Sequence, residues 1–124
     1  GIFTPNESTT EAMMSALETA GLAGKVKFVG FDNNDTLVSG IESKVIDALA
    51  SQDPFNMGYL AVKHAVAHLK GETVDKVVDT GALILTLDKL QDARSQELVS
   101  PDVDKWLKEK QPCRSHVHCC ALRR

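Results

Sequence analysis

Three polar side chains each follow a strand-like segment in this 124-residue sequence, and their chemistry suits a ligand with several hydroxyl groups. Asn6 follows the first such segment, Asp32 the second and Gln52 the third. A carboxylate accepts hydrogen bonds from neighbouring hydroxyls, whereas an amide donates and accepts at the same time. A polyol in a buried site needs both kinds of partner. We therefore predict that these three residues bind such a ligand.

The same residue types also have a purely structural use. Asn and Asp after a strand are common N-caps, where a side-chain oxygen accepts a hydrogen bond from a backbone N–H of the first helical turn. The alternative left open at each position is therefore a cap that touches no ligand.

Other patterns in the sequence point away from catalysis and metal binding. Residues 31–37 resemble the phosphatase signature of the haloacid dehalogenases, but Asn34 stands where that signature needs an acid that can titrate. His64 and His68 have the spacing of zinc ligands on a helix, yet no Glu follows His64, and both are predicted to face solvent. No nucleophile elbow and no Gly-rich phosphate loop is present. We expect a binding protein without enzyme activity, cofactor or metal.

Composition and charge limit the partners that the chain can have. Its hydrophobic share of 43% and charged share of 25% are those of an ordinary globular domain. All three Cys and three of the Arg lie in residues 112–124, so the rest of the chain is clearly acidic. An acidic body lacks the basic footprint of nucleic-acid binding. No apolar run approaches the roughly 20 residues that span a bilayer. We expect neither nucleic-acid binding nor direct membrane insertion.

Strand-like and helix-like segments alternate along the chain. Strands are predicted near residues 2–4, 26–31, 46–50 and 77–86, the last interrupted at 80–81; helices are predicted at 8–20, 36–43, 54–70, 88–99 and 102–110. A capping box at 8–11 is expected to open the first helix. The alternation predicts an α/β fold: a three-layer parallel sheet with helices on both faces. Ligands of such sheets bind beyond the carboxyl ends of the strands.

Several short motifs, taken in order, resemble one family of receptors. They are Phe-Val-Gly-Phe-Asp at 28–32, the segment 46–54, Met-Gly-Tyr at 57–59, the segment 68–72 and Asp-Thr-Gly at 79–81. Over residues 1–107 the chain is similar to the carboxyl-terminal part of periplasmic sugar-binding proteins of ABC importers, the ribose and galactose type with the LacI-like periplasmic binding protein type I fold.

The resemblance implies a receptor of two lobes that close on a monosaccharide and present it to an ABC permease in the periplasm. This chain, which starts without Met and holds no signal peptide, is then expected to be a fragment. Asn6, Asp32 and Gln52 match the family's sugar contacts from the second lobe. The alternative function is the effector domain of a LacI-type repressor, with DNA-binding helices upstream.

The family's chain path implies a division of the fragment. Residues 1–52 belong to the second lobe, and 53–90 form a helix and strand of the first lobe after the hinge crossing. Residues 91–111 are a carboxyl-terminal helical segment, and 112–124 form a Cys, His and Arg tail that matches nothing in the family.

A fragment of this kind leaves strand edges and apolar faces uncovered, so self-association through exposed sheet edges is expected. Two positions depart from the family's pattern. Lys44 replaces a helix-ending Gly and, if its φ is positive, costs about 1 kcal/mol. Lys89 replaces an expected Asn.

Overall fold

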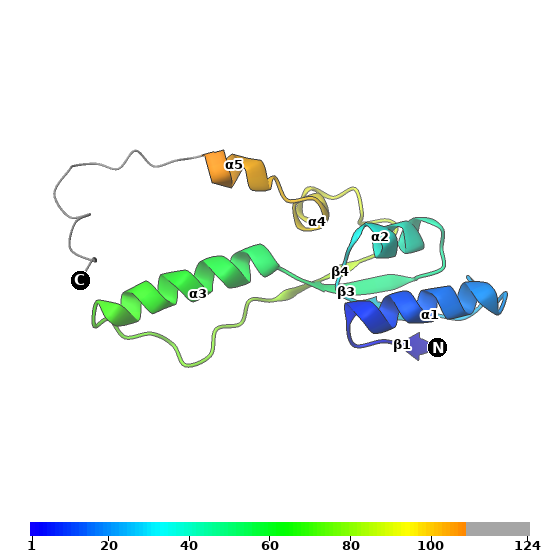
Figure 1. Ribbon diagram of the computed structural model, residues 1–124, viewed down its shortest axis with the longest axis horizontal. Helices are drawn as coiled ribbons and strands as arrows, with labels where there is room; N and C mark the ends of the chain where they lie inside the picture. The colour runs from blue at the N-terminus through cyan, green and yellow to red at the C-terminus, as the bar shows by residue number, and fades with distance from the viewer. Residues whose placement is uncertain (109–124) are drawn as a thin grey trace, which may run out of the picture.

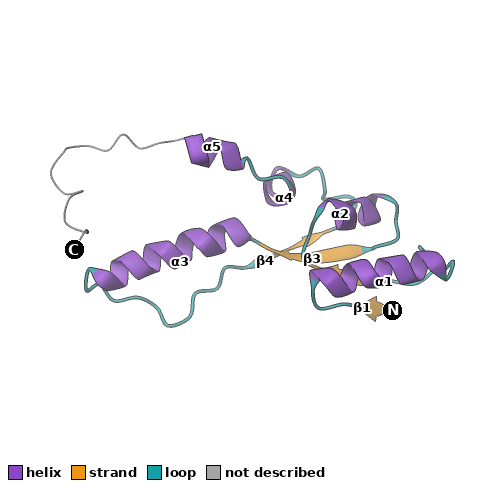
Figure 2. Ribbon diagram, in the orientation of Figure 1, coloured by secondary structure: helices purple, strands orange, loops and turns teal. Residues whose placement is uncertain are grey.

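The computed structural model describes residues 1–108, which form a four-stranded sheet and five helices (Figures 1 and 2). The elements in chain order are β1 (Ile2–Phe3), α1 (Glu7–Thr19), β2 (Phe28–Phe31), α2 (Asp35–Glu42), β3 (Ala48–Gln52), α3 (Pro54–Leu69), β4 (Ala82–Leu85), α4 (Ala93–Val99) and α5 (Val103–Lys108). The Cys, His and Arg tail at 112–124 and the end of the segment 91–111 lie outside the described residues.

The strands lie side by side in the order β1-β2-β3-β4. The first three are parallel, and Phe31 pairs with Ala50 at the carboxyl end of β2. The α/β class with a mainly parallel sheet is therefore confirmed. β4 is antiparallel to β3, with Gln52 paired to Ala82, so an entirely parallel sheet was wrong for this strand.

The direction of β4 follows from the path of α3. This helix runs out beyond the end of the sheet, and the chain comes back along it before β4 begins (Figure 1). A chain that leaves one end of a strand and returns at that same end must run in the opposite direction. β4, which the family resemblance assigned to the first lobe, thus pairs with β3 of the second-lobe segment; the lobe boundaries remain a prediction.

One face of the sheet carries the hydrophobic core. Phe28, Leu49 and Leu85 are fully buried on this face and pack with residues of the helices. The buried or partly buried helical members are Met13, Met14, Leu17, Leu37, Val38, Ile41, Leu98 and Val99. Helices α1, α2 and α4 therefore cover the same face, as expected where β1, β2 and β3 follow each other through right-handed crossovers.

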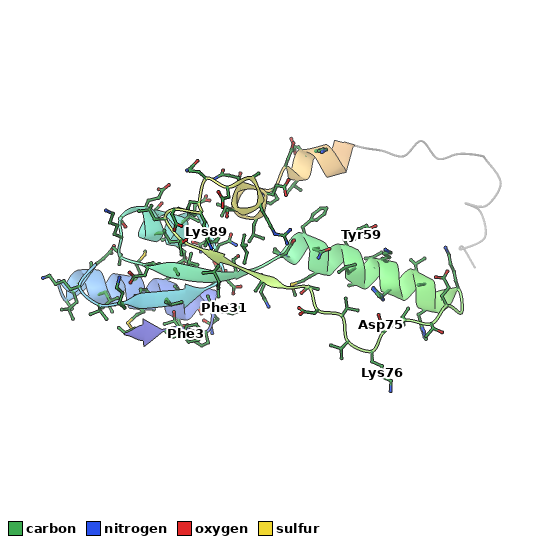
Figure 3. The ribbon with its side chains drawn as sticks, turned by 180° about the vertical axis from the view of Figure 1, so that it is seen from behind. Phe3, Phe31, Tyr59, Asp75, Lys76 and Lys89 are labelled. Atoms are coloured by element: carbon green, nitrogen blue, oxygen red, sulfur yellow. The ribbon has the colours of Figure 1, made fainter. Side chains whose placement is uncertain are left out.

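The opposite face of the sheet is apolar and partly open. Side chains alternate along a strand, so Phe3, Phe31 and Ile84 point away from the core. Phe3 is 61% exposed and Ile84 48% exposed, and Figure 3 shows the labelled Phe3 and Phe31 from this side. Within residues 1–108, helices thus cover one face of the sheet. The second helical layer, predicted for the opposite face, does not lie within these residues.

The helix starts follow from side-chain caps. The Oδ1 atom of Asn6 accepts a hydrogen bond from the N–H of Thr9, so α1 begins at Glu7. The predicted capping box at 8–11 was therefore placed too late in the sequence. The residue that caps the first turn of α1 is Asn6, which precedes the helix. Asn34 caps α2 and Asp53 caps α3, which has Pro54 in its first turn.

Helix α3 is unusual because none of its 16 residues is buried. Phe55, Tyr59, Val62, Val66 and Leu69 recur at steps of four and three, and each is exposed, Leu69 by 85%. We call these five residues the α3 stripe. Within residues 1–108, no helix has the length and apolar character needed to cross a membrane.

Candidate ligand-binding site

A cavity of about 350 Å³ lies at the carboxyl ends of β2 and β3. Its lining residues are Glu7, Asp32, Asn33, Ser51, Gln52, Pro54 and Met57. Parallel α/β sheets bind their ligands at this edge, because the loops after the strands meet there. The cavity is therefore the candidate site, and it brings together two of the three predicted residues.

Asp32 is the first residue after β2 and is half-buried. Its backbone N–H donates to the carbonyl oxygen of Ala50 at 2.9 Å, which ties it to β3. Its φ of +66° lies in the left-handed region, where Asp is tolerated better than most residues. Asp32 does not cap α2, since Asn34 does, so the structural alternative of a cap is wrong for Asp32.

Gln52 is the last residue of β3 and is exposed at the cavity. Its backbone is paired with Ala82 of β4. Two neighbouring strands therefore deliver a carboxylate and a primary amide to one cavity, which is the combination of acceptor and donor that the sequence predicts for a polyol.

Asn6 lies elsewhere and has a structural use. Its Oδ1 atom accepts hydrogen bonds from the N–H of Thr9 at 3.0 Å, the hydroxyl of Thr9 at 2.9 Å and the hydroxyl of Ser8 at 3.1 Å. It does not line the cavity, although the next residue, Glu7, does. The cap is thus observed at Asn6, and a ligand contact from this residue remains a prediction.

Sequence reasoning missed Glu7, Asn33 and Ser51. The amide nitrogen of Asn33 donates to the hydroxyl of Ser51, which is 1% exposed. The amide nitrogen of Asn34 donates to Glu7 Oε1 at 2.6 Å, so the start of α1 is joined to the start of α2. Position in the sequence was the signal that could have identified them, because each missed residue directly follows or precedes a residue predicted to bind the ligand.

The chemistry of the cavity is that of hydrogen bonding. Two carboxylates, those of Glu7 and Asp32, can accept from hydroxyl groups, and the amide of Gln52 can both donate and accept. Lowered pKa values occur away from the cavity. The Lys27 side chain and the Phe28 N–H lower the pKa of Asp47, and the Thr86 hydroxyl lowers that of Asp88.

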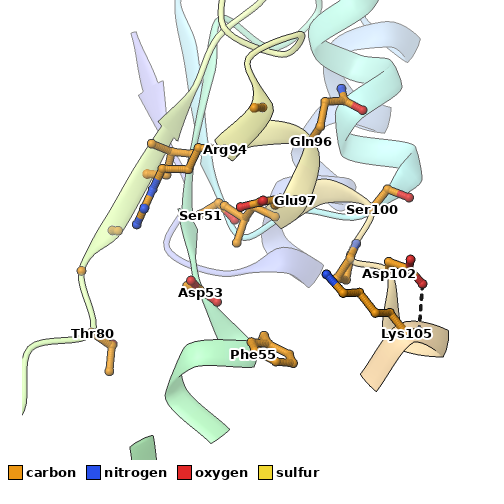
Figure 4. Close-up of a pocket in the computed structure, with 16 residues that line it drawn as sticks. Ser51, Asp53, Phe55, Thr80, Arg94, Gln96, Glu97, Ser100, Asp102 and Lys105 are labelled. Atoms are coloured by element: carbon orange, nitrogen blue, oxygen red, sulfur yellow. Dashed lines mark hydrogen bonds between the residues drawn. The ribbon is translucent and has the colours of Figure 1, made fainter. Parts of the chain in front are cut away.

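A second cavity, of about 620 Å³, lies between β4, the first turn of α3, and helices α4 and α5 (Figure 4). Arg94 and Lys105 contribute cations to its wall, and Asp53, Glu97 and Asp102 contribute carboxylates. Asp102 accepts a hydrogen bond from the backbone N–H of Lys105 at 3.0 Å. This cavity borders the antiparallel strand and contains none of the three predicted residues, so we place the candidate site at the smaller one.

One of the patterns that suggested other chemistry has a structural use. Asn34, which stands at the acid position of the phosphatase signature, caps α2. His68 is exposed and His64 half-buried on α3. Among the described residues, no group of three or more His, Cys, Asp or Glu side chains could hold a metal ion.

Residues 1–73 match the family described as the periplasmic binding protein domain. No curated protein matches the chain.

Several solved structures similar to the chain are described as solute-binding or periplasmic components of transporters. An ABC transporter solute-binding protein from Agrobacterium vitis with bound D-fucose is 31% identical, with 80% of this chain and 34% of that one covered and a TM-score of 0.76. A carbohydrate transporter solute-binding protein from Agrobacterium radiobacter in complex with D-arabinose is 36% identical, with the same coverage and a TM-score of 0.75.

A third structure, the periplasmic component of an ABC-type sugar transport system from Hahella chejuensis, is 37% identical. It covers 68% of this chain and 30% of its own length, with a TM-score of 0.65. The chain spans about a third of the length of the solved structures that it matches.

Proposed function

The chain belongs to the periplasmic binding protein domain family, and we propose that it forms part of the sugar-binding lobe of an ABC-importer receptor. The observation that supports this most directly is the shared cavity of Asp32 and Gln52 at the carboxyl ends of β2 and β3. The ligand class is a monosaccharide, because a carboxylate and an amide together match neighbouring ring hydroxyls. The solved neighbours named above contain D-fucose and D-arabinose.

The mechanism is closure of two lobes around the sugar. Contacts from both lobes exist only in the closed state, so the sugar shifts the population toward it. An ABC permease then recognises the closed receptor in the periplasm. Asp32 and Gln52 supply contacts from the second lobe, and Asn6 adds a third through the part of its side chain that does not cap α1.

The role is binding without chemical conversion of the sugar. The alternative, an effector domain of a LacI-type repressor, has less support, since the neighbours described above are solute-binding proteins of transporters. A phosphatase is disfavoured because Asn34 cannot act as a general acid and instead caps a helix.

Residues 53–90 complete the first lobe in the longer receptor. The α3 stripe supports this proposal, because a helix with five exposed apolar residues and no buried one needs a covering surface. The isolated 124-residue chain lacks that cover and self-associates.

The test is a titration of the 124-residue chain with D-arabinose and D-fucose, followed by backbone amide NMR shifts. Shifts at Asp32 and Gln52 are expected. Asp32→Asn removes the carboxylate and should weaken binding by about 10-fold or more. Glu42→Gln, the same chemical change at an exposed position on α2, is the matched control and should leave the affinity unchanged. Equal affinity of the Asp32→Asn variant and the parent would refute the assignment.

A further inference from the structure

The parallel ladder between β2 and β3 ends just before the candidate site. Phe31 and Ala50 are the last paired residues, and the Asp32 N–H makes a final bond to the Ala50 oxygen. Beyond this point β3 pairs only with β4, through the pairs Ser51–Leu83 and Gln52–Ala82. The backbone of the sheet therefore does not by itself hold Asp32 against Gln52.

A side-chain bridge continues where the ladder stops. The Asn33 amide donates to the Ser51 hydroxyl, and the Ser51 hydroxyl donates to the carbonyl oxygen of Gln52 at 3.3 Å. Ser51 is 1% exposed, so water does not compete freely for its hydroxyl. The bridge thus joins the residue after Asp32 to the residue before Gln52.

The backbone at Asp32 needs such a restraint. Its φ of +66° is a conformation that L-residues avoid, and it persists only where the surroundings hold it. One restraint is the bond from its N–H to Ala50, and the bridge through Asn33 is the second. With both in place, the turn that carries the Asp32 carboxylate is fixed on either side.

We infer that Asn33 and Ser51 are positioning residues, whose hydrogen bond holds Asp32 and Gln52 in the arrangement that binds the sugar. This inference rests on the proposed function and deepens it. Preorganised groups bind more tightly, because the cost of ordering them is met before the ligand arrives. Neither residue belongs to the hydrophobic core, so removing the bridge should loosen the site more than it destabilises the fold.

The experiment uses the full 124-residue chain with Asn33→Ala, Ser51→Ala and the double substitution. Ser39→Ala is the matched control, because Ser39 also bears a hydroxyl that donates to a backbone oxygen, that of Asp35, at a remote exposed site. The first readout is hydrogen exchange at the Asp32 amide without ligand, compared with the Leu37 amide, which Asn34 protects. The second is the affinity for D-arabinose and D-fucose.

Each single substitution is expected to speed exchange at Asp32 by about 10-fold, with little change at Leu37. The double substitution should add nothing, because each single change already breaks the same bond. Affinity for the sugars should fall in the same variants by a similar factor, while Ser39→Ala changes neither readout.

Three results separate the explanations. Unchanged exchange at Asp32 in both single variants overturns the inference. Weaker binding in Asn33→Ala alone, with unchanged exchange, means that Asn33 touches the sugar directly and also overturns it. If the parent binds neither sugar, the proposed function fails, and exchange at Asp32 then decides by itself whether the bridge holds the turn.

Discussion

A Cβ atom on Gly30 would lie 2.2 Å from the Cγ2 atom of Thr10. This close approach seats α1 against β2 and lets the Thr10 hydroxyl accept a hydrogen bond from the Phe31 N–H at 3.2 Å. The same hydroxyl donates to the Asn6 carbonyl oxygen at 2.7 Å. The contact therefore links the start of α1 to the end of β2, immediately before Asp32.

The first prediction follows from this contact. Gly30→Ala should destabilise the chain by about 1 to 3 kcal/mol, since the added methyl group forces α1 away from the sheet. Urea unfolding followed by circular dichroism measures the change. Gly58→Ala is the matched control: a Cβ there meets nothing within 4 Å, and Ala favours the interior of α3, so stability should stay equal or rise. Equal effects of the two substitutions would contradict the prediction.

The second prediction concerns Lys44, which follows α2. Its φ is +61°, so the condition for the cost of replacing a glycine here is met. Lys44→Gly should stabilise the chain by about 1 kcal/mol, because glycine adopts this conformation without a Cβ clash. Lys70, at the end of α3, has a φ of −82° and provides the control. Thermal unfolding should show a gain for Lys44→Gly and none for Lys70→Gly.

The third prediction is a pH dependence of stability at Asp47. The Lys27 ammonium, 2.5 Å away, and the Phe28 N–H lower the pKa of this carboxyl below its ordinary value of 3.8. A lowered folded-state pKa adds stability above the unfolded-state pKa and loses it as the pH falls through the folded-state value. Lys27 is 86% exposed, which screens the pair and keeps its contribution below about 1 kcal/mol.

Asp47→Asn should therefore be less stable than the parent at pH 7 and approach the parent as the pH falls below about 4. Chemical unfolding at several pH values, repeated at high salt, measures this difference. The gap at pH 7 should shrink in salt, because the pair is exposed. A constant gap from pH 7 to pH 3 would exclude an origin in ionisation.

The fourth prediction is self-association of the isolated chain through the α3 stripe. Val62 is at the centre of the stripe and 66% exposed. Val62→Glu places a charge there and should reduce self-association, because burying an unpaired charge is costly. Ala61→Glu, at the neighbouring exposed position outside the stripe, is the control. Analytical ultracentrifugation should show a lower average mass only for Val62→Glu, and a monomeric parent would contradict the prediction.

The sequence by itself determined the local elements and their chemistry. The alternation of β-rich and helical patterns was sufficient for the α/β class, and the steps of four and three located α3 to within a residue at its end. Residue type and position after a strand also singled out Asp32 and Gln52, although the same signal fits a helix cap. These features depend on neighbours in the chain, and a sequence reports such neighbours directly.

Only the tertiary structure decided which of these groups meet. Asn6 and Asp32 each follow a strand, yet one caps α1 and the other lines the cavity. The antiparallel direction of β4 and the bond between Asn33 and Ser51 join segments far apart in the chain. Such relationships depend on how strands are ordered and how closely helices approach them, and local periodicity carries no information about either.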